Sequence, residues 1–149
     1  MKHPNEEEIR KEVERGKKSL TAAKKLFEEE LFEDAISRSY YAILHVAKAV
    51  LLMENVKVYS HEAVKRLFGM HLIKTGKIEP EYSKIMREEQ DDRYLADYDV
   101  AFIVEAERVK KRIEDAEYFF EAMIKYLEKH QIDFNKKIDP EGNKGNKGD

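Results

Sequence analysis

Apolar and small residues recur at alternating intervals of four and three residues in the first part of the chain. Between residues 6 and 31 these positions are Ile9, Val13, Gly16, Leu20, Ala23 and Phe27. This spacing places them on one side of an α-helix. Asn5 precedes three glutamates, which are stabilised near the positive end of a helix dipole. The sequence therefore predicts a helix with Asn5 as its N-cap.

Two more helices are predicted before residue 77. Residues 32–54 have a broad apolar face and no Gly or Pro, which favours a helix of about six turns. Ser60 precedes an acidic first turn, a pattern typical of an N-cap, and opens the third helix. Gly76 is expected to end it and Pro80 to open the next, because Gly favours the position after a helix and Pro its first position.

The sequence of the second half of the chain predicts two further helices. Residues 81–95 are predicted to form the most polar helix. An irregular segment at Asp97, Tyr98 and Asp99 is expected to follow it. Residues 102–130 form a long helix with apolar positions again three and four residues apart. Long helices with short connections favour antiparallel neighbours. The predicted fold is therefore all-α, an up-and-down bundle of about five helices over residues 1–131, with a disordered polar tail at 132–149.

Composition and charge exclude several classes of protein. The chain has 149 residues, 42% hydrophobic and 40% charged, with no Cys and a net charge of −3. It therefore has neither disulfides nor thiolate metal sites, and it lacks the overall basic charge of a duplex-DNA binder. No apolar run approaches the roughly 18 residues that cross a membrane, and no signal peptide is evident. We expect a cytoplasmic protein. Its Lys and Glu content fits either a thermophilic source or a solvated helix surface.

Polar residues interrupt the apolar face of the second predicted helix. Ser37, Tyr41 and His45 are spaced by four residues, and Arg38 lies seven residues before His45, about 20° short of two turns. One stripe therefore presents a hydroxyl, a phenol, an imidazole and a guanidinium. These groups either form an internal hydrogen-bond network or line a polar cleft that binds phosphate or a base.

A second polar cluster comprises Arg93, Asp97 and Tyr98 at the end of the fourth helix. The guanidinium could bind a phosphate and the phenol ring could stack on a base. Alternatively, neighbouring carboxylates simply hold the arginine. His61 is expected in the first turn of a helix, where a cation is unfavourable and a neutral imidazole is favoured.

The remaining chemistry is limited by what the sequence lacks. The five His residues never pair at metal-ligand spacing, and no Glu-x-x-His motif occurs, which argues against a di-iron bundle. No glycine-rich phosphate loop is present. We therefore expect neither a metal nor a cofactor.

Four segments, in this order, resemble the HEPN superfamily. They are residues 35–45 (AISRSYYAILH), Ser60-His61, residues 67–76 (LFGMHLIKTG) and residues 93–98 (RYLADY). The resemblance spans about residues 6–130. Within the superfamily, the chain resembles in particular the small stand-alone HEPN proteins, formerly an uncharacterised family. It implies a five-helix domain that dimerises with its active cleft at the two-fold interface. It also implies a minimal nucleotidyltransferase as partner, in a toxin–antitoxin pair.

Active HEPN proteins are metal-independent ribonucleases that use an Arg and a later His separated by four to six intervening residues. The resemblance puts Arg93 at the position of that Arg, whereas the window for the His, residues 98–100, begins with Tyr98 and contains no His. A ribose 2′-hydroxyl would lack its usual general base, because an unperturbed Tyr, with a pKa of about 10, is a poor base at neutral pH.

The leading hypothesis from the sequence is a HEPN homodimer that binds RNA or nucleotide, partners a nucleotidyltransferase, and has weak or absent ribonuclease activity. Its site residues are Arg93 and Tyr98 for the chemistry, with Ser37, Arg38, Tyr41, His45, His61 and Asp97 for binding. Two alternatives stay open. One is an active ribonuclease toxin whose base is His45 or His61, and the other is a non-catalytic structural dimer module.

Overall fold

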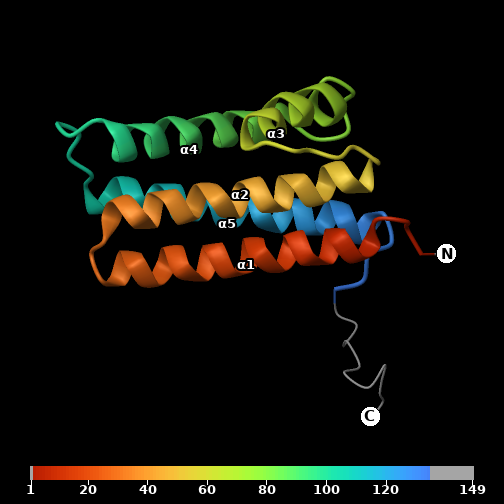
Figure 1. The fold of residues 1–149 in the computed structure, drawn as a ribbon, viewed down its shortest axis with the longest axis horizontal. Coiled ribbons are helices and arrows are strands. Elements are labelled where there is room, and N and C mark those ends of the chain that lie inside the picture. The colour runs from red at the N-terminus through yellow and green to blue at the C-terminus, as the bar shows by residue number, and fades with distance from the viewer. Residues whose placement is uncertain (1, 135–149) are drawn as a thin grey trace, which may run out of the picture.

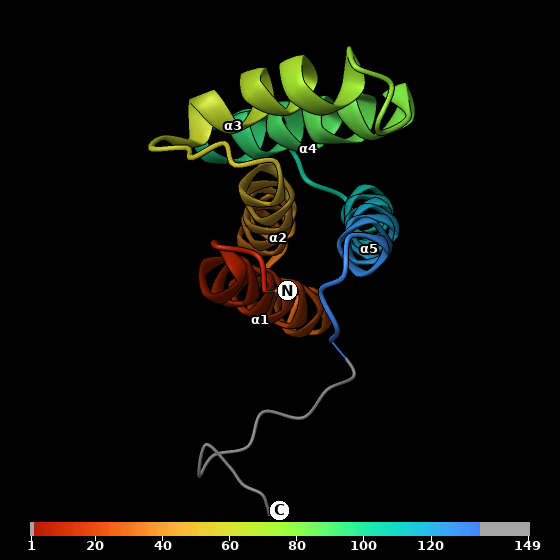
Figure 2. The same cartoon turned by 90° about the vertical axis from the view of Figure 1, so that its right-hand side faces the viewer.

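The computed structural model describes residues 2–134, which form five α-helices and one π-helical turn in two layers. The elements in chain order are α1 (Glu6–Glu28), α2 (Phe32–Met53), α3 (His61–Phe68), the π-helical turn η1 (Gly69–Ile73), α4 (Pro80–Tyr98) and α5 (Ala106–Lys129). The helices α1, α2 and α5 run side by side (Figure 1), while α3 and α4 lie together on the side of α2 away from α1 (Figure 2). The predicted all-α bundle is confirmed.

Several helix ends lie where the sequence predicts them. The hydroxyl of Ser60 accepts a hydrogen bond from the backbone N–H of Ala63 at 3.2 Å, which is the expected N-cap of α3. Gly76 has φ of +79°, a left-handed conformation that glycine adopts without strain, and it follows η1 as predicted. Pro80 is the first residue of α4.

Two of the predicted helix boundaries are wrong, and one predicted cap lacks its hydrogen bond. Asn5 occupies the N-cap position of α1 as predicted, but its side chain accepts no capping hydrogen bond, and its amide nitrogen donates to the carbonyl of Leu52 at 3.0 Å. The fourth helix continues through Asp97 and Tyr98 rather than ending at residue 95, since an ion pair from Arg93 to Asp97 supports another turn. The fifth helix begins at Ala106, not at residue 102.

The core forms around α2, whose residues are buried at 14 of 22 positions. Its apolar side chains contact α1, α4 and α5, so each of these helices buries its own stripe against it. The α1–α2 contact is close at Gly16. A Cβ atom there would lie 2.8 Å from the ring of Phe120 and 3.3 Å from the carbonyl oxygen of Ala42. The absence of a side chain at this position therefore lets three helices meet.

The packed part of the chain includes the first residues of the predicted C-terminal tail. Ile132 is buried in the core cluster, and the ring of Phe134 lies 5.6 Å from the guanidinium of Arg10. The rest of the predicted tail, residues 135–149, lies outside the described residues.

A buried polar cluster joins α2, α4 and α5. Glu89 of α4 is completely buried, with Oε1 2.9 Å from the hydroxyl of Ser39, and that hydroxyl is also 3.1 Å from the carbonyl oxygen of Arg112. One hydroxyl has one proton, so both contacts are hydrogen bonds only if Glu89 is protonated and donates to Ser39. Burial raises the pKa of Glu89 well above its ordinary value, in agreement with this arrangement.

The groups around Glu89 only partly compensate for its burial. Arg112 is buried and spreads its charge over Asp92 at 3.5 Å, Asp115 at 3.2 Å and Glu88 at 3.6 Å. The charge of Arg112 lowers the pKa of Glu89, but Asp115 and Asp92 raise it again. We therefore expect Glu89 to be a neutral acid inside the bundle.

Replacing this acid by an amide should change how stability depends on pH. A carboxyl whose pKa is raised on folding contributes fully to stability below its unfolded pKa of about 4.3, and the contribution is lost as pH rises toward the folded pKa. Glu89→Gln cannot lose a proton. We expect the variant to match the wild type near pH 4 and to exceed it by about 1 kcal/mol or more at pH 8.

Urea denaturation followed by circular dichroism between pH 4 and pH 8 measures this difference. Glu114→Gln makes the same substitution at an exposed position on α5 and is the control. Equal stabilities of wild type and Glu89→Gln at pH 8 would show that the buried carboxyl is not protonated there.

Candidate functional site

Arg93 of α4 lies against two tyrosine rings of α2. Its Nη2 donates to the hydroxyl of Tyr41 at 3.1 Å, and its guanidinium carbon is 5.6 Å from the ring centre of Tyr41 and 5.7 Å from that of Tyr40. The side chain is 27% exposed. The bond to Tyr41 is the one hydrogen bond of this guanidinium within residues 2–134, so further N–H donors remain for a ligand.

Asp97 orients this guanidinium and ties it to α2. Its Oδ2 lies 3.0 Å from Nε of Arg93, an ion pair without good hydrogen-bond direction, and its Oδ1 accepts from the hydroxyl of Ser37 at 3.3 Å. The sequence prediction that neighbouring carboxylates hold Arg93 and the prediction of a shared polar cleft are therefore compatible. Arg93 is held in place, but some of its N–H groups remain free to donate to a ligand.

His61, in the first turn of α3, lies beside the ring of Tyr41. The two ring centres are 5.4 Å apart. Burial lowers the pKa of His61, and the positive charges of Lys48, His45 and Arg93 lower it further. Its imidazole is therefore neutral at pH 7, as its place near a helix N-terminus also favours.

His45 is held by a carboxylate that the sequence did not reveal. Its Nδ1 donates to Oε1 of Glu12 in α1 at 2.8 Å, and Oε2 of the same carboxylate lies 3.3 Å from Nζ of Lys48. Burial raises the pKa of Glu12, but the hydrogen bond from His45 and the charge of Lys48 outweigh it, so the pKa is lowered overall. In the neutral imidazole, a proton fixed on Nδ1 leaves Nε2 able to accept one.

Glu12 and Lys48 are the two site residues that the sequence reading missed. Lys48 follows His45 by three residues and extends the stripe of Ser37, Tyr41 and His45, so the helical spacing could have identified it. Glu12 belongs to a helix with many glutamates, and nothing in the sequence distinguishes it from the others.

Two predicted site residues are not brought to this cluster. Tyr98 is 64% exposed and its ring contacts Tyr94, with 5.0 Å between ring centres. It follows Arg93 by five residues, about 140° around the helix, whereas Asp97 at four residues lies on the same side. Arg38 is exposed and forms no ion pair within residues 2–134.

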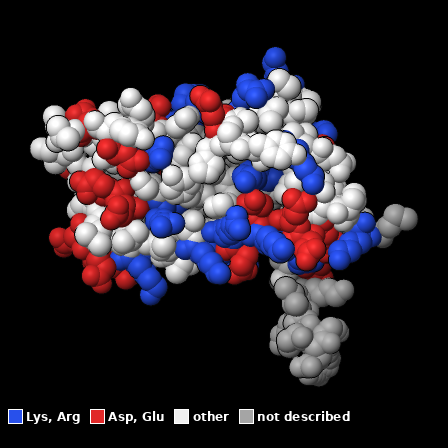
Figure 3. Space-filling view, viewed as in Figure 1, with Lys and Arg blue, Asp and Glu red and all other residues white. Residues whose placement is uncertain are grey.

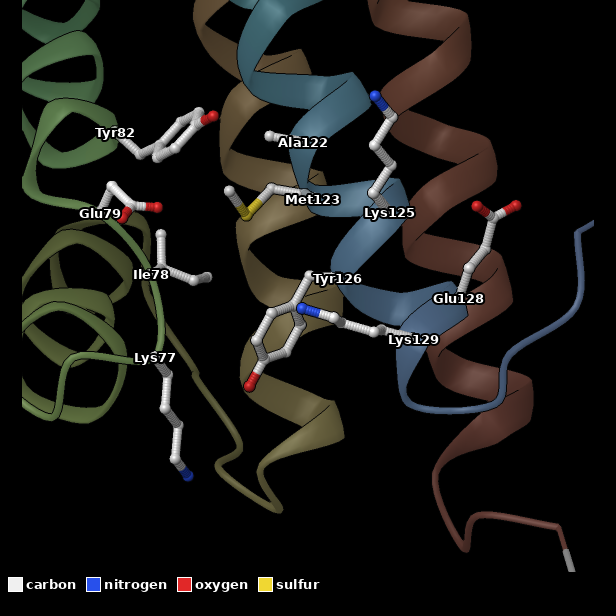
Figure 4. A pocket seen from close by; sticks show the side chains of 10 residues that line it. All are labelled: Lys77, Ile78, Glu79, Tyr82, Ala122, Met123, Lys125, Tyr126, Glu128 and Lys129. Carbon is white, nitrogen blue, oxygen red and sulfur yellow. The ribbon is translucent and has the colours of Figure 1, made fainter.

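A separate cleft lies between the start of α4 and the end of α5. It has a volume of about 590 Å³ (Figure 4). Tyr82, Met123 and Tyr126 are among its lining residues, and Tyr126 donates to Glu54 at 2.6 Å. None of the predicted site residues lines it. Tyr82 precedes Arg93 by 11 residues, about 16 Å along α4, so this cleft is distinct from the Arg93 cluster.

Within residues 2–134, no helix is long and apolar enough to cross a membrane.

Comparison with known proteins places the chain in a family. Residues 9–130 match the HEPN domain family. A protein of Methanocaldococcus jannaschii named "Putative toxin MJ0605" is 39% identical over 121 residues, 81% of this chain and 90% of the relative. A second protein of this organism, "Putative toxin MJ0142", is 30% identical over 120 residues, 80% of this chain and 82% of the relative.

A third relative comes from a bacterium. A UPF0332 protein of Thermotoga maritima is 32% identical over 114 residues, 76% of this chain and 86% of the relative. The chain therefore belongs to the HEPN domain family, as the resemblance of its motifs predicted.

Removing one hydroxyl tests the contact between α2 and α4. Tyr41→Phe keeps the ring beside His61 but removes the acceptor for Arg93. We expect a loss of about 1 kcal/mol in the free energy of unfolding, because the bond is partly buried and its donor is charged.

Urea denaturation measures this loss. Tyr118→Phe, which removes an exposed hydroxyl bonded to Glu81, is the matched control and should cost less than about 0.5 kcal/mol. Equal costs in the two variants would show that the Tyr41 bond adds nothing to the stability of the domain.

Proposed function

We propose that this HEPN protein binds RNA or a nucleotide at the cluster around Arg93 and that its ribonuclease activity is weak or absent. The observation that carries the proposal is the arginine itself. It is held in place by Tyr41 and Asp97, it is partly exposed, and it has further N–H groups that can donate to a ligand. A planar guanidinium of this kind matches the geometry of phosphate, and the adjoining rings of Tyr41 and His61 offer a surface for a base.

The proposal of weak activity rests on the motif position at which active family members have a His. The window that holds His in active members begins here with Tyr98, and that phenol is exposed on a different side of α4. Histidine is the usual general base at neutral pH, and a phenol is a poor replacement for it. Binding therefore depends on Arg93, whereas the usual proton acceptor is missing.

The biological setting is also part of the proposal. The relatives named as putative toxins support a toxin–antitoxin role, and the family resemblance points to a minimal nucleotidyltransferase as the partner. A homodimer is consistent with exposed apolar side chains near the end of α4 and after it. These are Tyr94, Tyr98, Val100 and Ile103. Exposed apolar residues gathered in one region are typical of an interaction surface.

Arg93→Ala tests the binding site. We expect the variant to remain folded and to lose affinity for RNA or nucleotide by roughly a hundredfold, since one charge-assisted contact contributes about 1.5–3 kcal/mol. Fluorescence anisotropy with labelled RNA measures the affinity. Arg87→Ala removes the same charge from an exposed position on the same helix and should bind normally. Unchanged affinity in Arg93→Ala would overturn the proposed site.

An RNA-cleavage assay on the same proteins, with a chelator present, tests the activity. No cleavage by either protein supports a binding role. Cleavage that survives the chelator and disappears in Arg93→Ala would show an active metal-independent nuclease. No RNA binding, together with loss of stability on truncation of Tyr41 or Arg38, would favour the structural module.

A ribonuclease with a relocated base is the second candidate, and one observation favours it. His61 lies beside Tyr41, which in turn accepts from Arg93, so a neutral imidazole lies one side chain away from the phosphate-binding group. Its lowered pKa keeps it able to accept a proton at pH 7. His45 is the other imidazole of the cluster, oriented by Glu12.

If this candidate is right, His61→Ala should lose RNA cleavage by about a hundredfold or more and still bind RNA, because a general base contributes roughly 10²–10⁴ in rate. His45→Ala tests the other imidazole, and His71→Ala, outside the cluster, is the control. Cleavage rates from single-turnover assays measure the effect. Full activity in both the His61 and the His45 variants would eliminate a relocated histidine base.

A further inference from the structure

A row of basic side chains follows the outer face of α1, apart from the site described above. Its members, called here the α1 basic row, are Lys11, Arg15, Lys18 and Lys25. With Ala22 they occupy positions four, three, four and three residues apart, so they lie on one side of the helix. All four side chains are exposed, and a shallow hollow of about 320 Å³ beside Ala22 separates Lys18 from Lys25.

No ion pair in the described part of the chain neutralises these cations, a property that they share with other exposed basic residues such as Arg38 and Lys110. Within residues 2–134 none of the four forms an ion pair, whereas Lys24, on the α5 side of the same helix, pairs with Glu117. Figure 3 shows a cluster of basic side chains in the lower middle of the molecule, with acidic side chains beside and among them. A chain with a net charge of −3 therefore has a local positive surface.

The chemistry of this face favours a polyanion over an acidic protein. Stable protein interfaces have an apolar centre. The exposed large hydrophobic residues of the described chain all lie off α1: Leu31, Tyr59, Met70, Tyr94, Tyr98, Val100, Ile103 and Tyr118. On this face the hollow is lined by Glu14, Thr21 and Ala22 beside the lysines, and no large apolar side chain is exposed. A largely basic face of this kind is typical of contacts with a phosphate backbone, where release of counterions supplies the free energy.

The row is also connected to the Arg93 cluster. Arg15 follows Glu12 by three residues on α1, and Glu12 contacts both His45 and Lys48 of α2. The stripe of α2 leads from there to Tyr41 and Arg93. Glu12 therefore links the helix that carries the row to the polar stripe of α2.

We propose that the α1 basic row binds the phosphate backbone of a single-stranded RNA that also has a phosphate at Arg93. This inference rests on the proposed function and adds the class of ligand, an oligonucleotide rather than a mononucleotide. Lys11 and Lys25 are 14 residues apart, about 21 Å along the helix. At roughly 3.4 Å per stacked nucleotide, this length accommodates about six nucleotides.

Neutralising three members of the row tests the inference. The triple variant Lys11→Ala, Lys18→Ala, Lys25→Ala should fold normally, because alanine is a better helix former than lysine. Its affinity for a 12-nucleotide RNA at low salt should fall by roughly tenfold or more. The slope of log K against log salt should decrease in magnitude by about 2, since each lost phosphate contact on a single strand contributes about 0.7. Mononucleotide binding should not change.

The control is a second triple variant, Lys110→Ala, Lys125→Ala, Lys129→Ala, which removes the same charge from exposed positions on α5. We expect it to change RNA affinity less than twofold. Normal RNA affinity and salt slope in the α1 variant, or an equal loss in the α5 variant, would overturn the inference. If the 12-nucleotide RNA binding depends on Arg93 but not on the row, only the inference fails. If the unaltered protein does not bind RNA, the proposed RNA binding fails with it.

Discussion

The burial of α2 is the constraint on which the rest of the structure depends. Fourteen of its 22 residues are buried, and helices from both layers pack against it. Each large apolar side chain that leaves water contributes about 1.5–3 kcal/mol, more than a typical hydrogen bond. The apolar contacts of α2 therefore decide how α1, α4 and α5 are placed, and the polar groups must find partners within that arrangement. Gly16 matters for the same reason, because it allows α1 to approach α2 closely.

This helix contributes to two polar clusters with different access to water. Ser39 faces inward to Glu89, which is completely buried and is favoured as a neutral acid. Tyr41 and His45 lie on the partly exposed side, where Arg93 and Glu12 can remain charged. Only the second cluster can exchange its partners for a ligand, because only its groups can be reached. The buried cluster joins α2, α4 and α5. The resulting positions of α2 and α4 place Tyr41 and Arg93 within hydrogen-bond distance of each other.

Charge distribution explains how a protein of negative net charge could bind a polyanion. In the Arg93 cluster the carboxylates of Asp97 and Glu12 balance Arg93 and Lys48, so the cluster offers directed donors more than a strong positive field. The α1 basic row has no such balance within the described residues. Directed contacts at one place and long-range attraction at another are complementary contributions to nucleic-acid binding.

The sequence by itself determined the all-α class, the number of helices and most of their ends, because these depend on local spacing and on residues such as Ser60, Gly76 and Pro80. It also predicted site residues at Arg93, Asp97, Ser37, Tyr41, His45 and His61, from their residue types, their spacing and the family resemblance. Only the tertiary structure decided how they combine. Glu12 has no local signal, since its partners are more than 30 residues away, and the continuation of α4 through Tyr98 turned that phenol away from Arg93. Contacts between helices depend on their relative rotation, which the packing of α2 sets and which no local pattern contains.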